Sequence, residues 1–263
     1  MKPPSYLFLL ALLFLPSLAC RATTQDLTQG SGNITTQVIG VRNFNSISLD
    51  GSGKVYIEQG PTEQLIIEAD DNILPLLDTH LKGEQLVLGV KPFQNIHPSQ
   101  PIIYRLKVRD LTELAIRGSG DFYVDSLDTK DLKLSILGSG TINISNLVGK
   151  NLDLNLLGSG NITLEAINVK NIEASISGSG DILLQGEAKN QEISISGSGN
   201  YLASDLETSL SEIKIPGSGD LTVWVTNDLR VGVNGSGTIQ YYGHPTVEQD
   251  GLGSGKLIPL GEK

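Results

Sequence analysis

The sequence predicts an all-β fold, a right-handed β-helix or β-solenoid whose coils of about 20 residues stack along one axis, and three observations support this prediction. The triplet Gly-Ser-Gly occurs ten times, and from Gly118 onward consecutive triplets are separated by 20, 20, 20, 19, 20, 18 and 18 residues. Apolar and polar residues alternate on both sides of each triplet, which is the period of a strand with one buried face. The apolar positions also recur at the same place in each repeat, as stacking requires.

Two apolar columns can be followed along the repeats. Four residues after the first glycine of each triplet stand Phe122, Ile142, Ile162, Ile182, Tyr201, Leu221, Ile239 and Leu257. Two residues further stand Val124, Ile144, Leu164, Leu184, Ala203, Val223 and Tyr241. Antiparallel hairpins in a sandwich or barrel are the alternative, but the constant period and the recurring turn favour a stack. About seven coils at roughly 4.8 Å each would form a rod of about 35 Å.

Each triplet is expected to form a sharp corner in which glycine takes positive φ without a Cβ penalty. The residues that follow the triplets are Asp121, Thr141, Asn161, Asp181, Asn200, Asp220, Thr238 and Lys256. This column holds three aspartates, but no two are neighbours, and calcium needs several oxygen ligands at about 2.3–2.6 Å. We therefore expect these side chains to bond the backbone of their own turn, and we expect no metal site.

Residues 38–117 do not follow the 20-residue period, although they still alternate like strands. Residues 72–80 are expected to contain a short helical turn, and residues 92–101 to form a loop. An open solenoid end leaves strand edges unpaired. We therefore expect residues 38–117 to form longer, hairpin-containing coils that cap the N-terminal end of the regular repeats of residues 118–263.

The N-terminus is typical of an export signal. One lysine precedes an apolar run from Tyr6 to Leu15, which is too short for a transmembrane helix of about 20 residues. Ala19 followed by Cys20 resembles the lipobox of bacterial lipoproteins, in which the preceding peptide is removed and the cysteine is acylated. Ser17 departs from that pattern, because leucine is usual at its position. The sequence predicts a signal peptide over residues 1–19 and lipid attachment at Cys20, with an ordinary secretory signal as the alternative.

Residues 20–37 are mostly polar and are expected to form a flexible, lipid-anchored tether. The domain of residues 38–263 would follow it. Because two or three acyl chains give stable anchoring, the membrane is an expected partner. No other apolar run approaches the length of a membrane-spanning helix. The domain is therefore expected to be carried across the cytoplasmic membrane and held at the cell envelope, at the cell surface or in the periplasm.

Composition and charge exclude several classes of function. The formal net charge of −10 argues against nucleic-acid binding, which relies on clustered lysine and arginine. Because Cys20 is the only cysteine, neither an intrachain disulfide nor a cysteine zinc cluster can form. His80, His97 and His244 are far apart in the sequence and lack metal-ligand spacing. No cofactor is expected.

Three features of the sequence carry a family resemblance. They are the stretch FNSISLDGSGKVYIEQG from Phe44, the stretch LIIEADDNILPLLDTHLKGEQLVLGV from Leu65, and the recurring GSG followed by Asp, Asn or Thr. With the lipoprotein-type leader, they resemble the bacterial family described as putative auto-transporter adhesin, head GIN domain, over about residues 38–255. The resemblance implies a right-handed β-helix-like fold at the cell surface or in the periplasm. It implies no catalytic residues.

Acidic side chains form the first candidate site. Asp70 and Asp71 could supply half of a carboxylate pair for glycan cleavage, but that chemistry needs a second carboxylate across a cleft. Nothing in the sequence marks such a partner. Together with Glu63 and Glu68, they are better interpreted as a solvated acidic surface.

Aromatic side chains near the C-terminal coils form the second candidate site. Tyr241 falls in an inward column, whereas Trp224 and Tyr242 fall outward, where they could stack on sugar rings. Trp224 and Tyr242 are therefore the candidate ligand-binding residues. The alternative is that these rings cap the last coils.

The leading functional hypothesis is a non-catalytic, lipid-anchored envelope or surface protein that presents a rigid solenoid for adhesion or scaffolding. Its expected partners, besides the membrane, are a glycan or a surface protein. Two alternatives remain open: an enzyme that acts on polysaccharide, and a protein that associates with itself into a filament or coat.

Overall fold

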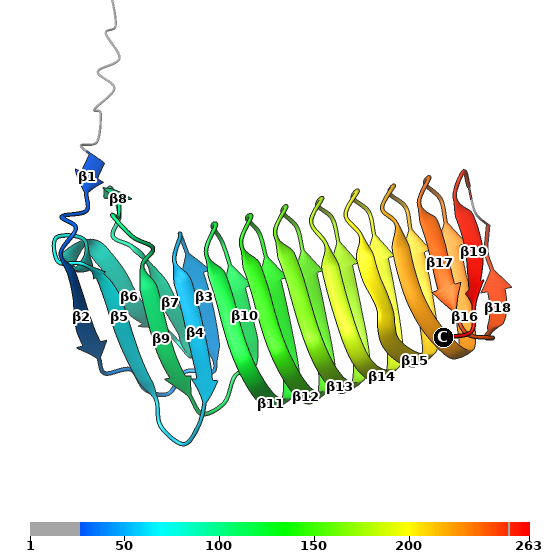
Figure 1. The fold of residues 1–263 in the computed structure, drawn as a ribbon, viewed down its shortest axis with the longest axis horizontal. Helices are drawn as coiled ribbons and strands as arrows, with labels where there is room; N and C mark the ends of the chain where they lie inside the picture. The colour runs from blue at the N-terminus through cyan, green and yellow to red at the C-terminus, as the bar shows by residue number, and fades with distance from the viewer. Residues whose placement is uncertain (1–26, 252) are drawn as a thin grey trace, which may run out of the picture.

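The computed structural model describes residues 27–251 and 253–263, which form a β-solenoid (Figure 1). The predicted signal peptide, Cys20 and the first part of the predicted tether lie outside the described residues. Of the nineteen strands among the described residues, seventeen belong to one continuous sheet. Within this part of the chain, no helix has the length and apolar character that crossing a membrane requires.

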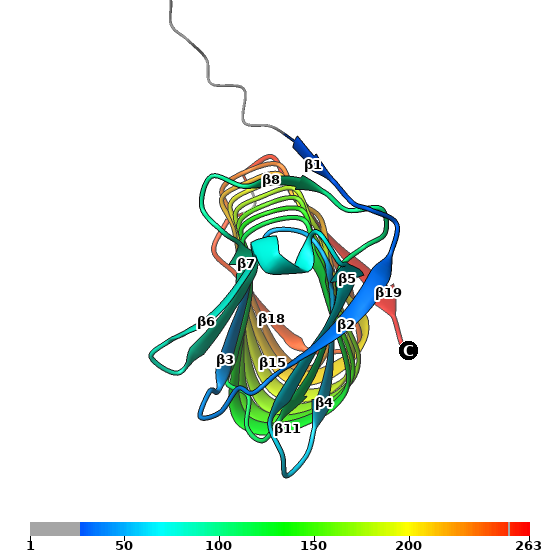
Figure 2. The same cartoon turned by 90° about the vertical axis from the view of Figure 1, so that its left-hand side faces the viewer.

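Six long strands form the regular coils. They are β11 (Asp121–Ile136), β12 (Thr141–Leu156), β13 (Asn161–Ile176), β14 (Ile182–Ile195), β15 (Tyr201–Ile215) and β16 (Leu221–Val233). Each strand curves midway, so that its two halves enclose the core (Figure 2). Strands β11 and β12 pair in parallel at an offset of 20 residues throughout, as Phe122 with Ile142 shows. The predicted solenoid with coils of about 20 residues is confirmed.

The two predicted apolar columns form the core. Ile142, Ile162 and Ile182 are neighbours in register and have no solvent exposure. This arrangement follows from the pleat, because adjacent strand residues face opposite sides and only one side faces inward. Leu257 and Tyr241, at the C-terminal end of their columns, are partly buried against the same core.

The glycines of the regular corners are required for a reason that differs from the prediction. Positive φ occurs in the first two triplets, at Gly32 (81°), Gly51 (153°) and Gly53 (140°), and in the last, at Gly253 (53°). It occurs at no glycine of the triplets from Gly118 to Gly237. In those triplets, a Cβ on either glycine would meet the backbone or a core side chain of the preceding coil well under 3.0 Å away. Glycine is needed there because successive corners stack backbone on backbone.

Longer coils with insertions precede the regular ones, as predicted. Their strands are β3 (Ser46–Asp50), β4 (Lys54–Gln59), β5 (Gln64–Asp70), β6 (Leu77–Lys82), β7 (Gln85–Val90), β9 (Ile103–Val108) and β10 (Glu113–Ile116). Strands β3 and β4 pair in parallel with β10 and β11, and β7 and β9 pair in parallel with β3 and β4. One expected hairpin is formed by β6 and β7, which are antiparallel and consecutive in the chain. Strand β5 is antiparallel to β9, although three strands separate the two in the chain.

Two local predictions for this region can be compared with the structure. The short helical turn expected within residues 72–80 is the 3-10 turn η1 (Leu74–Leu76). The loop expected over residues 92–101 contains a short strand, β8 (Asn95–His97), which pairs with a segment far earlier in the chain.

Residues 27–37 contain one short strand and most of a second, and the prediction that the flexible tether extends to residue 37 is wrong for this part. Strand β1 (Leu27–Gln29) pairs in parallel with β8, and β2 (Ile34–Ile39) pairs antiparallel with β5. Nearly all side chains of β2 are exposed. The polar composition is misleading because an edge strand can be held by backbone hydrogen bonds without burying its side chains.

Three short strands close the C-terminal end of the solenoid. They are β17 (Thr238–Tyr242), β18 (Thr246–Gln249) and β19 (Lys256–Gly261). Strands β17 and β18 pair with different halves of β16, and β19 then pairs with β17.

Candidate functional site

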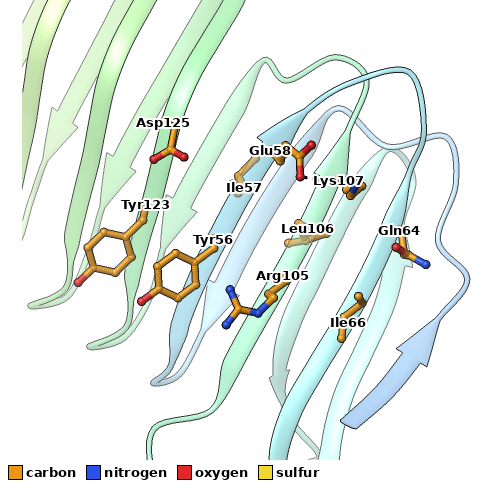
Figure 3. A pocket seen from close by; sticks show the side chains of 10 residues that line it. All are labelled: Tyr56, Ile57, Glu58, Gln64, Ile66, Arg105, Leu106, Lys107, Tyr123 and Asp125. Carbon is orange, nitrogen blue, oxygen red and sulfur yellow. Dashed lines mark ion pairs between the residues drawn. The ribbon is translucent and has the colours of Figure 1, made fainter.

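Three flat side chains lie in a row on the outer surface of the N-terminal coils. Tyr56 of β4 is in register with Arg105 of β9 on one side and with Tyr123 of β11 on the other. The pleat directs Tyr56 outward because its neighbours Val55 and Ile57 are buried. These three residues define the tyrosine row, whose side chains Figure 3 shows next to one another.

The tyrosine row is held in a defined geometry. The ring centroids of Tyr56 and Tyr123 are 5.1 Å apart, and the ring planes differ by 18°, which is a stacked arrangement. The guanidinium carbon of Arg105 lies 5.4 Å from the centroid of Tyr56, within cation–π range. Glu68 accepts a hydrogen bond of 2.8 Å from Arg105 Nε, and this bond raises the pKa of Arg105. The ion pair therefore helps to orient the guanidinium group beside the Tyr56 ring.

A groove of about 350 Å³ runs beside the tyrosine row. Its polar lining comes from Glu58, Gln64, Lys107 and Asp125, and Ile66 contributes an apolar wall (Figure 3). Lys107 Nζ is 3.6 Å from a carboxylate oxygen of Glu58. The groove thus combines aromatic surface with donors and acceptors of both charges, which is the composition of a site for a small polar ligand.

Sequence reasoning missed the tyrosine row, although a signal for it was present. Tyr56 and Tyr123 each stand five residues after the first glycine of a triplet, at Gly51 and Gly118. Because equal positions in a repeat stack, the two rings had to be neighbours once the two triplets were placed in adjacent coils. Arg105 had no such signal, since it belongs to a coil without a triplet.

The structure brings the predicted residues Trp224 and Tyr242 together, on adjacent strands and in register. Both are half-buried, and Lys263 covers them: its Nζ lies 5.8 Å from the ring centroid of Trp224 and 5.2 Å from that of Tyr242. Lys263 also forms an ion pair with Asp205, and this contact lowers the pKa of Asp205. The geometry therefore matches the alternative in which these rings fasten the last coils.

The prediction of a solvated acidic surface is wrong for two of its four residues. Asp70 is fully buried, and its carboxylate accepts hydrogen bonds from Gly32 N (2.8 Å), Ser99 N (2.9 Å) and the Ser99 hydroxyl (2.5 Å). The hydroxyl of Ser99 is the main cause of a pKa for Asp70 below its ordinary value. The Glu63 side chain is only 6% exposed and lies 3.2 Å from Arg109. Both carboxylates hold separate segments together.

The column of residues after the triplets forms hydrogen bonds between coils. Asn161 Oδ1 accepts a bond of 3.0 Å from the backbone N–H of Asp181, and Asp181 Oδ1 accepts one of 3.0 Å from that of Asn200. The predicted role in backbone bonding is confirmed, but the partner is the next coil and not the same turn. Within the described residues, no group of three or more His, Cys, Asp or Glu side chains could hold a metal ion.

We predict that calcium leaves the stability of the protein unchanged, because the carboxylates of this column already accept backbone hydrogen bonds. Thermal melting with calcium and with a chelator should give midpoints that agree within error. A clear rise of the midpoint in calcium, reversed by the chelator, would contradict this prediction.

The fold places the chain among the parallel β-solenoids. The family model of the putative auto-transporter adhesin, head GIN domain, matches residues 43–245. The chain belongs to this family, as the sequence predicts. Among proteins of curated function, none matches the chain.

Solved structures with the same fold include two putative adhesins. The one from Parabacteroides distasonis ATCC 8503 is 27% identical with a TM-score of 0.85, and the alignment covers 89% of this chain and 100% of that one. The one from Parabacteroides merdae ATCC 43184 is 25% identical with a TM-score of 0.83, covering 89% and 99%. A third structure, described as a putative lipid binding protein from P. distasonis ATCC 8503, is 26% identical with a TM-score of 0.84, covering 89% and 100%.

Proposed function

We propose that this protein is a non-catalytic adhesin of the bacterial envelope, anchored by lipid at Cys20, and that it binds a glycan in the groove beside the tyrosine row. The observation that carries the proposal is the stacked pair Tyr56 and Tyr123 with Arg105, set in a groove with polar side chains. Membership of an adhesin-like family and the similarity to solved structures of putative adhesins support the adhesive role.

The ligand class follows from the chemistry of the groove. A sugar offers an apolar C–H surface, which suits aromatic rings, together with hydroxyl groups that both donate and accept hydrogen bonds. Gln64 offers both kinds of partner, whereas Glu58 and Asp125 offer acceptors and Lys107 offers donors. The tyrosine row is built on strands that continue into the rigid stack, so that little side-chain freedom is lost on binding.

We predict that replacing Tyr56 and Tyr123 together with alanine strongly weakens glycan binding on an array of bacterial and host glycans. Each aromatic contact is worth about 1 kcal/mol, so that losing two lowers affinity by about thirtyfold. Leu202→Ala is the matched control, because Leu202 is exposed and lies in the same outward row several coils away. Unchanged binding by the double variant, with loss in Trp224→Ala, would place the site at the C-terminal coils.

We predict that Cys20 is the lipid attachment point, since the only cysteine of the chain follows Ala19 directly after the apolar run. Expression in a bacterial host with labelled palmitate should label the parent protein and leave Cys20→Ser unlabelled and released from the membrane fraction. Label in Cys20→Ser, or membrane binding equal to that of the parent, would contradict the prediction.

A further inference from the structure

The N-terminal end of the solenoid carries a corner without charged side chains. We define the neutral corner as residues 27–34 and 92–101, which include β1, β8 and the loop between β7 and β8 except its first residue, Lys91. These 18 residues contain no Lys, Arg, Asp or Glu, in a chain of which 18% is charged. Strands β1 and β8 lie side by side at one corner of this end (Figures 1 and 2).

Phe93 stands at the tip of the neutral corner. Its side chain is 86% exposed, the highest value among the large apolar side chains in the described part of the chain. Its φ is 63°, a left-handed conformation that is costly for a bulky residue. The turn that contains it is closed by a hydrogen bond of 3.2 Å from Gln94 N to Lys91 O. The loop therefore holds an apolar ring out in water at the expense of backbone strain.

Strand β1 begins close to Phe93 along the chain of β8, and Leu27 stands seven residues after Cys20 in the sequence. Strands β1 and β8 are parallel, and Leu27 is in register with Asn95, two residues after Phe93. Leu27 is itself 47% exposed. Six residues separate Cys20 from Leu27, and a chain of that length spans at most about 25 Å. A lipid on Cys20 therefore brings the neutral corner within reach of the bilayer surface.

Asp70 makes this corner rigid. Its carboxylate accepts hydrogen bonds from both segments, through Gly32 on one and Ser99 on the other. Gly30 N also donates to His97 O at 2.9 Å. Asp71 lies at the border, where its bonds from Ser31 and Asn33 lower its pKa and keep it ionised.

We infer that the neutral corner is a membrane-contact surface, at which Phe93 inserts into the interface of the bilayer that holds the lipid anchor. The inference rests on the proposed anchor at Cys20. An apolar aromatic ring gains free energy at this interface, and none of the 18 residues of the corner carries a charge that must be desolvated. The neighbouring charges are those of Lys91 and Asp71, at the border of the corner. This contact places the N-terminal coils, rather than the C-terminal ones, next to the bilayer.

Tryptophan fluorescence of the full acylated chain in phosphatidylcholine vesicles tests this contact. Because Trp224 is the only tryptophan, the double variant Trp224→Phe, Phe93→Trp reports on the corner alone. Its emission should shift to the blue and be quenched by lipids brominated on their acyl chains. The matched control Trp224→Phe, Leu137→Trp places the probe at another exposed position, 54% accessible and in the regular coils, where emission should stay water-like. Water-like emission from position 93 in vesicle-bound protein would overturn the inference.

A second measurement separates this contact from the anchor. In the unacylated Cys20→Ser chain, Phe93→Ser should lower partitioning onto the same vesicles by about tenfold, the effect of losing one buried aromatic side chain. Equal partitioning of the two chains would count against the contact. Failure of palmitate labelling at Cys20 would refute the anchor and leave this comparison unaffected.

Discussion

Replacing Gly158 with alanine is expected to destabilise the solenoid by at least about 3 kcal/mol, at the upper end of what overpacking costs. The new Cβ would meet the carbonyl oxygen of Gly138 in the preceding coil. That oxygen belongs to the backbone and accepts a hydrogen bond of 3.0 Å from Ser159 N, so that it cannot move without breaking the stack. The melting midpoint should fall by at least about 6 °C.

Gly232→Ala is the matched control for this prediction. Gly232 also lies in a strand of the regular coils, but a Cβ at its position would meet nothing within 4 Å. Its substitution should change stability by no more than about 0.5 kcal/mol. Similar melting curves for Gly158→Ala and the parent would show that the corners are not stacked as described.

Replacing Ile162 with aspartate is expected to unfold the protein or make it aggregate, whereas Asn161→Asp should be tolerated. Ile162 has no solvent exposure and lies between Ile142 and Ile182, so that a carboxylate there would be buried without a partner. An uncompensated buried charge costs about 3–5 kcal/mol. Asn161 is exposed, and aspartate keeps the oxygen that accepts the Asp181 N–H. This change should stay within about 0.5 kcal/mol.

The equivalent pair one coil later should give the same contrast. Ile182→Asp places a carboxylate in the same buried column, and Asp181→Asn keeps an oxygen for the Asn200 N–H. Thermal melts of the four variants measure both comparisons. Equal tolerance of Ile162→Asp and Ile182→Asp would mean that this column is not the core.

The regular coils could be predicted in detail because three signals coincide there. The period of the triplets, the alternation of apolar residues and their alignment between repeats all describe the same register, which pairs Phe122 with Ile142 and Ile142 with Ile162. The requirement for glycine was also visible, but its cause was not. A single repeat considered alone suggests a turn with positive φ, whereas the clash at Gly158 exists only between two coils.

The N-terminal part was less predictable because its contacts join segments far apart in the chain. Asp70 looks like a surface residue beside Asp71, and its burial depends on Gly32 and Ser99, which lie 38 and 29 residues away. The tyrosine row has the same character, since Arg105 reaches Tyr56 through the pairing of β9 with β4, and four strands separate these two in the chain. No local pattern encodes such pairings, so these features required the structure.

The constant offset between coils also affects how such a chain can evolve. Strands β11, β12 and β13 pair residue for residue at an offset of 20, and their corners stack on one another. One such unit of 20 residues can be duplicated or deleted in frame, from any starting position within it. The coils on either side of the change then still align their inward and outward columns without a mismatch. The rod can therefore lengthen or shorten in steps of about 4.8 Å, and the distance between the first and last coils can be changed by recombination without redesign of the core.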